Sequence, residues 1–270
     1  MKKIYFRGSV VVSALIAVTA VYGLFVPGSY SRETANWAAQ ARAQDWADLV
    51  LAAPILLVSA LLAQKNSIKA YLVWLGTLFF TIYSFLLFAF LVHFNAMFPA
   101  YMAVLGLTTY LLIFSLAQDR NLTDRIGHAE NWIRKGSAVL LLVVGVLFYF
   151  VWGKDIVANL LAGTAPRDLV ETGLPTNGVY VIDTALCLPA LLIGGYRLLK
   201  KQKLGYVLGG GLLTFSTLMS ANITLLMVYL SVKGFNAEKP LIVVFSLFTL
   251  INFIFTAGYI AHIRELDRPR

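Results

Sequence analysis

Long runs of apolar residues constrain the fold of this chain more than any other feature of its sequence. Eight runs are long enough to cross the ~30 Å hydrocarbon core of a bilayer, and 59% of the 270 residues are hydrophobic. The expected spans cover residues 8–27, 47–63, 70–93, 98–117, 137–153, 179–199, 204–231 and 240–262. Backbone polar groups in lipid must be satisfied within their own segment, so each span should be a helix. The sequence therefore predicts an all-α integral membrane protein with eight transmembrane helices.

The net charge of +9 indicates membrane topology rather than binding to nucleic acid. Of the 22 Lys and Arg residues, 16 fall on one side of the predicted spans. The other side carries only Arg32, Arg42, Lys154, Arg167, Lys233 and Lys239. Because loops rich in Lys and Arg stay in the cytoplasm, both termini are predicted to be cytoplasmic. The lipid bilayer is then the expected partner of the basic side.

An internal repeat relates the first part of the chain to the second. Asp48, Pro54, Tyr71 and Gly76 recur 135 positions later as Asp183, Pro189, Tyr206 and Gly211. The repeat predicts two four-helix halves, residues 1–117 and 137–270, that run in the same direction about an axis along the membrane normal. In repeated membrane proteins the functional site commonly lies where the two halves meet.

Three further segments have predicted roles. Residues 118–136 place apolar side chains at helical spacing, which predicts a cytoplasmic amphipathic connector helix; a docking or regulatory role is the alternative. Residues 154–178 form a long outer loop that could cover one mouth of the bundle. The first apolar run follows Lys2, Lys3 and Arg7, as in a secretory signal. We expect that run to remain as the first span, because the repeat needs it to complete the first half.

The repeated aspartates are the leading candidates for ligand binding or proton relay. Asp48 and Asp183 each open a predicted span on the outer side. A carboxylate in the first turn of a helix can be stabilised by the helix dipole alone, and Asp45 with Asp48 resembles a capping arrangement. Asp183 follows residues that already look membrane-embedded, and an ionisable group inside a span is by default a functional candidate.

The repeated prolines should kink their helices six residues beyond the aspartates. Pro54 and Pro189 each remove one intrahelical hydrogen bond, which would free the carbonyl oxygens of Val50 and Ala185. A carboxylate beside a free carbonyl could bind a cation or an amine. The alternative is an ordinary kink whose carbonyl is met by a hydroxyl such as that of Thr184.

Other polar residues complete the candidate site. His93 and Asn95 end the third span on the outer side and are expected to line the mouth of a pocket. One His with two Asp could bind a metal, but the spacing matches no metal motif, so neither a metal nor a cofactor is predicted. Asn222 and Asn252 lie in mid-membrane, where each needs a hydrogen-bond partner, and they are expected to join neighbouring helices.

The stretches Gln44-Asp45, Tyr83 to His93-Phe94-Asn95, Thr176-Asn177 to Asp183…Pro189, and Leu204-Gly205-Tyr206 are similar to those of one protein group. They resemble a group of bacterial multi-spanning membrane proteins of unassigned function. The resemblance covers most of the chain and implies a bacterial inner-membrane or plasma-membrane location. It implies no activity.

Three classes of function are open on the sequence alone. The leading hypothesis is binding or transport of a small molecule or ion through an outward-facing polar pocket between the two halves. A membrane enzyme acting on a lipid or quinone, with His93 and an aspartate in acid–base roles, is one alternative. A non-catalytic membrane partner or sensor subunit is another. The chain has no nucleophile elbow, HExxH helix, phosphate-binding loop or CxxC pair, so no catalytic residue is assigned.

Overall fold

The structure is a computed structural model that describes residues 1–118, 122–128, 132–235 and 239–265. Within these ranges, eight helical stretches are long and apolar enough to cross a membrane. They are Lys3–Phe25, Ala35–Gln64, Ile68–Leu91, Phe98–Ala117, Trp132–Ala162, Gly178–Leu199, Lys203–Val232 and Lys239–Ala261. Each predicted span is matched by one of these helices, and the fold is that of a multi-pass all-α membrane protein.

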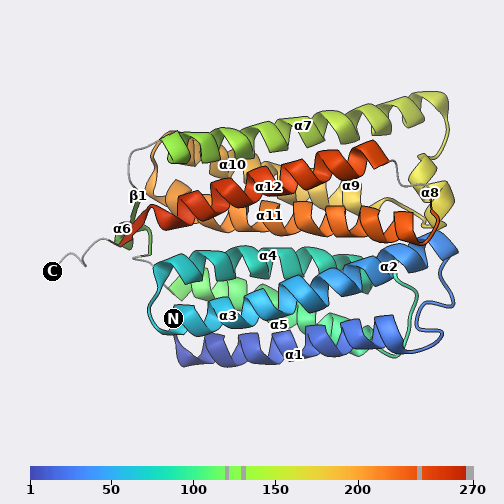
Figure 1. Ribbon diagram of the computed structural model, residues 1–270, viewed down its shortest axis with the longest axis horizontal. Coiled ribbons are helices and arrows are strands. Elements are labelled where there is room, and N and C mark those ends of the chain that lie inside the picture. Colours follow the sequence, from blue (N-terminus) through green and yellow to red (C-terminus); the bar gives the residue numbers. More distant parts are fainter. Residues whose placement is uncertain (119–121, 129–131, 236–238, 266–270) are drawn as a thin grey trace.

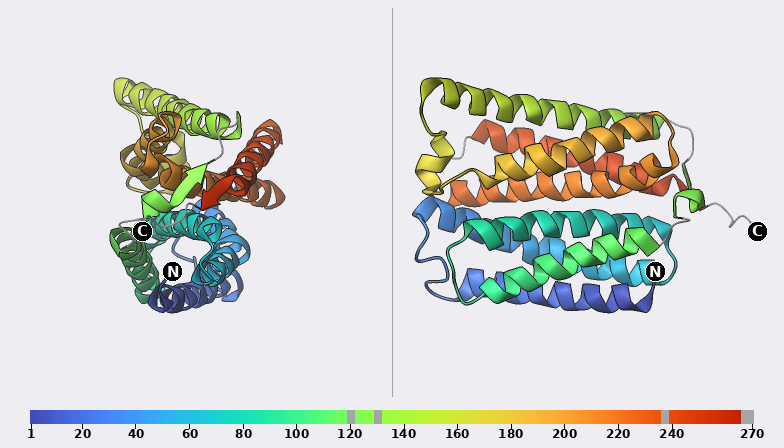
Figure 2. Two further views of the ribbon diagram at one scale, coloured as in Figure 1. Left: turned by 90° about the vertical axis from the view of Figure 1, so that its left-hand side faces the viewer. Right: turned by 180° about the vertical axis from the view of Figure 1, so that it is seen from behind.

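The helices form two bundles that lie side by side (Figures 1 and 2). The first bundle contains α1 (Lys3–Phe25), α2 (Ala35–Ala47), η1 (Asp48–Ala52), α3 (Ala53–Gln64), α4 (Ile68–Leu91) and α5 (Phe98–Gln118). The second contains α7 (Trp132–Ala162), α8 (Arg167–Thr172), α9 (Gly178–Ile182), η2 (Asp183–Cys187), α10 (Leu188–Leu199), α11 (Lys203–Val232) and α12 (Lys239–Ala261). α1 packs against α2, α3 and α5, within the first bundle.

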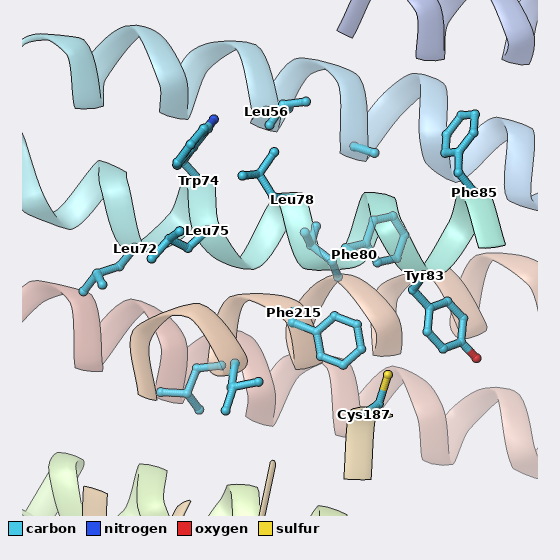
Figure 3. Packing of buried hydrophobic residues seen from close by; sticks show 14 of the residues in the cluster. Leu56, Leu72, Trp74, Leu75, Leu78, Phe80, Tyr83, Phe85, Cys187 and Phe215 are labelled. Atoms are coloured by element: carbon cyan, nitrogen blue, oxygen red, sulfur yellow. The ribbon is translucent and has the colours of Figure 1, made fainter. Parts of the chain in front are cut away.

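Helices α4 and α11 make the main contact between the bundles, and α2 also packs on α11. Gly76 of α4 lies against the backbone of Gly211, so a side chain at position 76 would overlap its carbonyl oxygen. Small residues at such crossings let helix backbones approach closely in a membrane. Next to this crossing, the rings of Phe79 and Phe215 pack in a tilted arrangement with their centroids 4.6 Å apart. Figure 3 shows Phe215 among the buried side chains of α4, with Tyr83 pointing toward the second bundle.

The two bundles contain the same local irregularity at the same register. η1 and η2 are π-helical turns of five residues that begin at Asp48 and Asp183. Each is followed by a 12-residue helix with a proline in its first two positions. Lys65 and Lys200 follow those helices as C-cap residues, and the next residues, Asn66 and Lys201, have left-handed backbone angles of φ 66° and 58°. π-helical turns are rare in proteins and are frequent at functional sites.

The second span begins earlier than the apolar pattern predicts. Its helix starts at Ala35, where Thr34 caps it by accepting a hydrogen bond from the backbone N–H of Trp37. Residues 35–47 are rich in Ala and Gln, which favour helix without being apolar enough to read as membrane-spanning. Asp48 therefore does not lie in a first helical turn, and the predicted capping arrangement of Asp45 with Asp48 is wrong.

The connector also differs from its prediction. Residues 118–136 do not form one amphipathic helix: the described part contains α6 (Leu122–Arg125), strand β1 (Ile126–His128) and the first residues of α7. β1 pairs antiparallel with β2 (Ile263–Glu265), near the C-terminus. Residues 119–121 and 129–131, which include part of the predicted apolar face, lie outside the described residues. The conformation of this segment depends on backbone pairing with β2. The helical periodicity of the sequence does not reveal such pairing.

The N-terminus and β2, the last described element, lie at the same end of the molecule, as an even number of spans requires (Figure 1). The N-terminal ammonium group of Met1 donates a hydrogen bond to the carbonyl oxygen of Ala63, at the end of α3. The ammonium group of Lys69 donates to the carbonyl oxygen of Ala261, at the end of α12. Helix α8 lies at the opposite end, between α7 and α9 in the chain.

Candidate functional site

A cavity of about 410 Å³ lies between the two bundles, at the end opposite the termini. Residues from α2, α4, α7, α8, α9, α11 and α12 line it. Most lining side chains are apolar or aromatic, as in typical small-molecule sites. The polar lining residues are Asn36, Gln40, Gln44, Tyr83, Trp152, Asp168, Glu171, Thr172, Asn177, Tyr180, Asp183 and Asn222.

The cavity extends from the surface of the protein into its interior. Asp168 and Glu171 of α8 are exposed to solvent, whereas Gln44 is 7% exposed and Asn222 is 4% exposed. Asp183 is half-buried between these two levels of exposure. A ligand entering past α8 would therefore meet carboxylates first and buried amides last.

Asp183, the first residue of η2, lines the cavity. Its Oδ2 accepts a hydrogen bond of 2.9 Å from the indole N–H of Trp152 on α7, and the Tyr83 hydroxyl of α4 interacts with the same carboxyl group. The two partners come from different bundles, so this carboxyl group is held at their interface. The sequence identified Asp183 as a candidate and gave no sign of either partner.

A chain of hydrogen-bonded side chains connects Asp48 to the cavity. The amide nitrogen of Gln44 donates to Asp48 Oδ1 at 3.2 Å and to Ser84 Oγ at 2.9 Å. The amide oxygen of Gln44 accepts from the amide nitrogen of Asn222, at 2.7 Å and across the interface between the bundles. Asp48 is 1% exposed and does not line the cavity, so the two repeated aspartates are not adjacent in one pocket.

Helix α8 covers the exposed end of the cavity and connects the bundles. The hydroxyl of Thr34, at the start of α2, donates to the carbonyl oxygen of Thr172 at 2.9 Å. The amide nitrogen of Asn36 donates to Glu171 at 3.3 Å. Although Asp168 is exposed on one side, partial burial of its carboxyl group, and then the charges of Glu171 and Asp155, raise its pKa above the ordinary value. The outer loop predicted to cover the mouth thus contributes a short helix to the cavity wall.

His93 and Asn95 lie outside the cavity. The backbone N–H of His93 donates to Glu33 at 2.7 Å, and its ring Nδ1 lies 2.9 Å from the second oxygen of that carboxylate. Asn95 accepts a hydrogen bond from the backbone N–H of Met97, which shapes the turn before α5. The structure does not bring either residue to the lining that the sequence predicted for them. Among the described residues, no three His, Cys, Asp or Glu side chains are grouped to hold a metal.

The carbonyl group next to Pro189 differs from the predicted one. The hydroxyl of Tyr149 donates a 2.7 Å hydrogen bond to the carbonyl oxygen of Thr184, five residues before the proline. The chain is π-helical here, and the backbone N–H of Leu188 reaches back five residues to Asp183. The N–H missing from Pro189 would therefore have bonded Thr184 rather than Ala185. Tyr149 satisfies this oxygen within the bundle.

The two asparagines predicted to lie in mid-membrane have different surroundings. Asn252 accepts a hydrogen bond of 2.7 Å from Ser216 and donates to the carbonyl oxygen of Phe248, and so joins α11 to α12 as expected. Asn222 instead lines the cavity and bonds across the interface to Gln44. Sequence reasoning missed Gln44 because its helix was not recognised as part of a span.

No family model matches this chain, and comparisons with curated proteins and with solved structures found no match. The class of protein therefore rests on the fold itself. Eight helices able to cross a membrane, counted among the described residues, define a multi-pass membrane protein.

Proposed function

We propose that the protein binds a small molecule or ion in the cavity between its two bundles, as a step in moving that ligand across the membrane. The cavity itself carries this proposal, because it leads from exposed carboxylates to buried polar groups at the interface. Membrane transporters built from repeats commonly place their substrate site at such an interface.

We also infer that the two bundles are parallel repeats. The sequence frame of 135 residues coincides with equal local structure: two π-helical turns, two 12-residue helices after them and two left-handed residues. The contact of Gly76 with Gly211 pairs corresponding positions, as an axis between the bundles and along the membrane normal would require. Lysines, including Lys65 and Lys200, are concentrated at the end of the molecule that carries the N-terminus. This distribution supports a cytoplasmic location for that end.

The inferred topology has a direct test in intact bacterial cells. In a Cys187→Ser background, Thr176→Cys lies on the α8 side and Lys201→Cys lies at the termini end; both positions are exposed. A membrane-impermeant thiol reagent should label position 176 in intact cells and position 201 only after lysis. The reverse pattern would place the cavity opening on the cytoplasmic side.

The enzyme hypothesis has less support than binding. It required His93 near an aspartate, whereas His93 is paired with Glu33 outside the cavity. A non-catalytic partner or sensor role remains compatible with a ligand cavity, since a sensor also binds its ligand. Uptake by proteoliposomes separates transport from sensing.

Blocking the cavity tests ligand binding without assuming the ligand's chemistry. Leu87 lines the cavity, whereas Leu107 is 41% exposed on α5. A chemically mixed compound set would be screened by thermal unfolding against the purified wild type, Leu87→Trp and the control Leu107→Trp. Compounds that stabilise the wild type and the control should not stabilise Leu87→Trp. Stabilisation of all three proteins alike, or of none, would contradict binding in this cavity.

A further inference from the structure

We infer that the ligand of this cavity is a small organic cation that carries at least one N–H donor, with Asp183 as counter-ion and Asn222 as acceptor. We further infer that Asp48 is a positioning residue, which acts through Gln44 to set the orientation of the Asn222 amide. This inference rests on the proposed function and names the substrate class of the same site.

The charge of the lining favours a cation. Three carboxylates, those of Asp183, Asp168 and Glu171, line the cavity, and none of its described lining residues is Lys or Arg. An anionic ligand would meet like charges at the entrance and at half depth, and would find no counter-ion among these lining residues. A carboxylate pairs with an ammonium group by a charge-assisted hydrogen bond, which is stronger than a neutral one.

The buried end of the cavity offers an acceptor that has no donor. Asn222 is 4% exposed, and its Oδ1 is buried without a hydrogen-bond partner. A buried acceptor left unpaired costs about 1–3 kcal/mol, and this one belongs to a residue that lines the cavity. A ligand with an N–H group can satisfy it.

The orientation of the Asn222 amide follows from the side chains to which it is hydrogen-bonded, directly or through Gln44. Asp48 Oδ1 accepts, so Gln44 turns its NH₂ group toward Asp48 and Ser84. The Gln44 oxygen then faces Asn222 and accepts from its NH₂ group. Because an amide has its donor and acceptor on opposite branches, the Asn222 oxygen is the atom left unbonded. Asp48 thereby leaves an acceptor, rather than a donor, unpaired on Asn222, a residue that lines the cavity.

The rest of the lining matches an apolar body. The rings of Trp37, Phe88, Phe148, Trp152, Phe235 and Phe245 line the cavity. Aromatic faces attract ammonium groups and also bury apolar surface. A bare metal ion would need several oxygen ligands at once, and the described residues hold no group of three acidic or His/Cys ligands. An amine with an aromatic or aliphatic body uses both parts of this lining.

A matched set of three probes tests the ligand class: 4-phenylbutylamine, 4-phenylbutan-1-ol and 4-phenylbutanoate. They share one apolar body and differ in the charge of the head group. Binding to the purified full-length protein would be measured by calorimetry at pH 7.5, where the amine is charged. We expect the amine to bind at least tenfold more tightly than the alcohol, and the carboxylate to bind most weakly. Equal or tighter binding of the alcohol or the carboxylate would overturn the cationic class while leaving a binding cavity in place.

Asp183→Asn should remove the preference for the amine. We expect the ratio of amine affinity to alcohol affinity to fall about tenfold, with the alcohol affinity changing less than threefold. The control is Asp124→Asn, because Asp124 pairs with Lys203 on the surface near the termini end. A preference that survives in Asp183→Asn would overturn its role as counter-ion. No binding of any probe to the wild type would also overturn the inference, whereas the compound screen with Leu87→Trp judges the cavity independently.

The role of Asp48 is tested by the same affinity ratio, which a purely structural defect would not change selectively. Asp48→Leu removes the acceptor for Gln44 and should lower the amine preference severalfold, whereas Asp48→Asn keeps an acceptor oxygen and should restore it. If Asp48→Leu does not fold, Gln44→Met interrupts the same chain of hydrogen bonds with Asp48 intact. It should give the same loss of amine preference. An unchanged ratio in the folded variants would overturn the positioning role.

Discussion

Gly76 of α4 and Gly211 of α11 lie against each other across the interface of the two bundles, although 135 residues separate them in the chain. No side chain separates the backbones there. The approach is close because a Cβ atom on Gly76 would overlap the carbonyl oxygen of Gly211 and the Cβ of Thr214. Neither of these backbone-fixed atoms can move aside as a flexible side chain could.

The first prediction is that Gly76→Val destabilises the protein strongly. The added side chain must push α4 away from α11, and overpacking of this kind costs about 1–3 kcal/mol or more. The control is Gly106→Val on α5, where no atom lies within 4 Å of an added Cβ. Thermal unfolding in detergent should show a large loss only for position 76. Equal losses at both glycines would show that helix propensity, rather than contact, dominates.

The second prediction concerns the buried pair of Tyr30 and Asp45. The Tyr30 hydroxyl donates a 2.7 Å hydrogen bond to Asp45, which is 1% exposed. Burial and then the charge of Asp45 raise the pKa of Tyr30, so the phenol keeps its proton at neutral pH. Tyr30→Phe leaves a buried carboxyl oxygen without this donor and should cost about 1–3 kcal/mol. Tyr110→Phe, at a side chain that is 60% exposed, serves as the control in the same unfolding assay.

The third prediction separates binding from the enzyme hypothesis. His93→Ala should leave the affinity of any cavity ligand within about twofold of the wild type, because His93 pairs with Glu33 outside the cavity. Calorimetry with the tightest compound from the screen measures this. A tenfold loss would mean that His93 reaches the ligand, and would favour an acid–base role for it.

The fourth prediction is a pH-dependent effect of Asp168. Because its pKa is raised in the folded protein, its stabilising contribution is present below the ordinary value of 3.8 and is lost as pH rises through the folded pKa. Ionised Asp168 is therefore unfavourable at neutral pH, beside Glu171 and Asp155. Asp168→Asn should raise the unfolding temperature at about pH 8 and should have little effect below about pH 4. Asp124→Asn, which loses its pair with Lys203, should not raise the unfolding temperature at either pH.

The apolar runs were sufficient to predict the eight spans, because hydrophobic length is a property of each segment alone. They were insufficient at helix ends such as Ala35, where Ala and Gln extend the helix without extending the apolar run. The π-helical turns also escaped prediction. The spacing of Asp48 and Pro54 shows that a proline interrupts the helix. The α-helical pattern, in which an N–H bonds the carbonyl four residues earlier, then selects the wrong carbonyl oxygen.

The cavity was predictable in position only. A repeat indicates that polar residues of two halves meet, and Asp183 was found in this way. The hydrogen bond between Gln44 and Asn222 joins residues 178 positions apart, which only the packed structure reveals. The place of His93 differs from the predicted one for the same reason. Its sequence position suggested the mouth of a pocket, whereas the buried carboxylate of Glu33 holds it elsewhere.

The hydrogen bonds that join the start of α2 to α8 have a mechanical consequence. Thr34 and Asn36 belong to the first bundle, whereas Thr172 and Glu171 belong to the second, so any rocking of one bundle against the other must break these bonds. The close backbone contact of Gly76 and Gly211 would be the pivot of such rocking, and the hydrogen bonds at α8 would oppose it. Because Glu171 lines the cavity, a ligand that draws its carboxylate inward would break the bond from Asn36, whereas the bond from Thr34 to the backbone of Thr172 would remain.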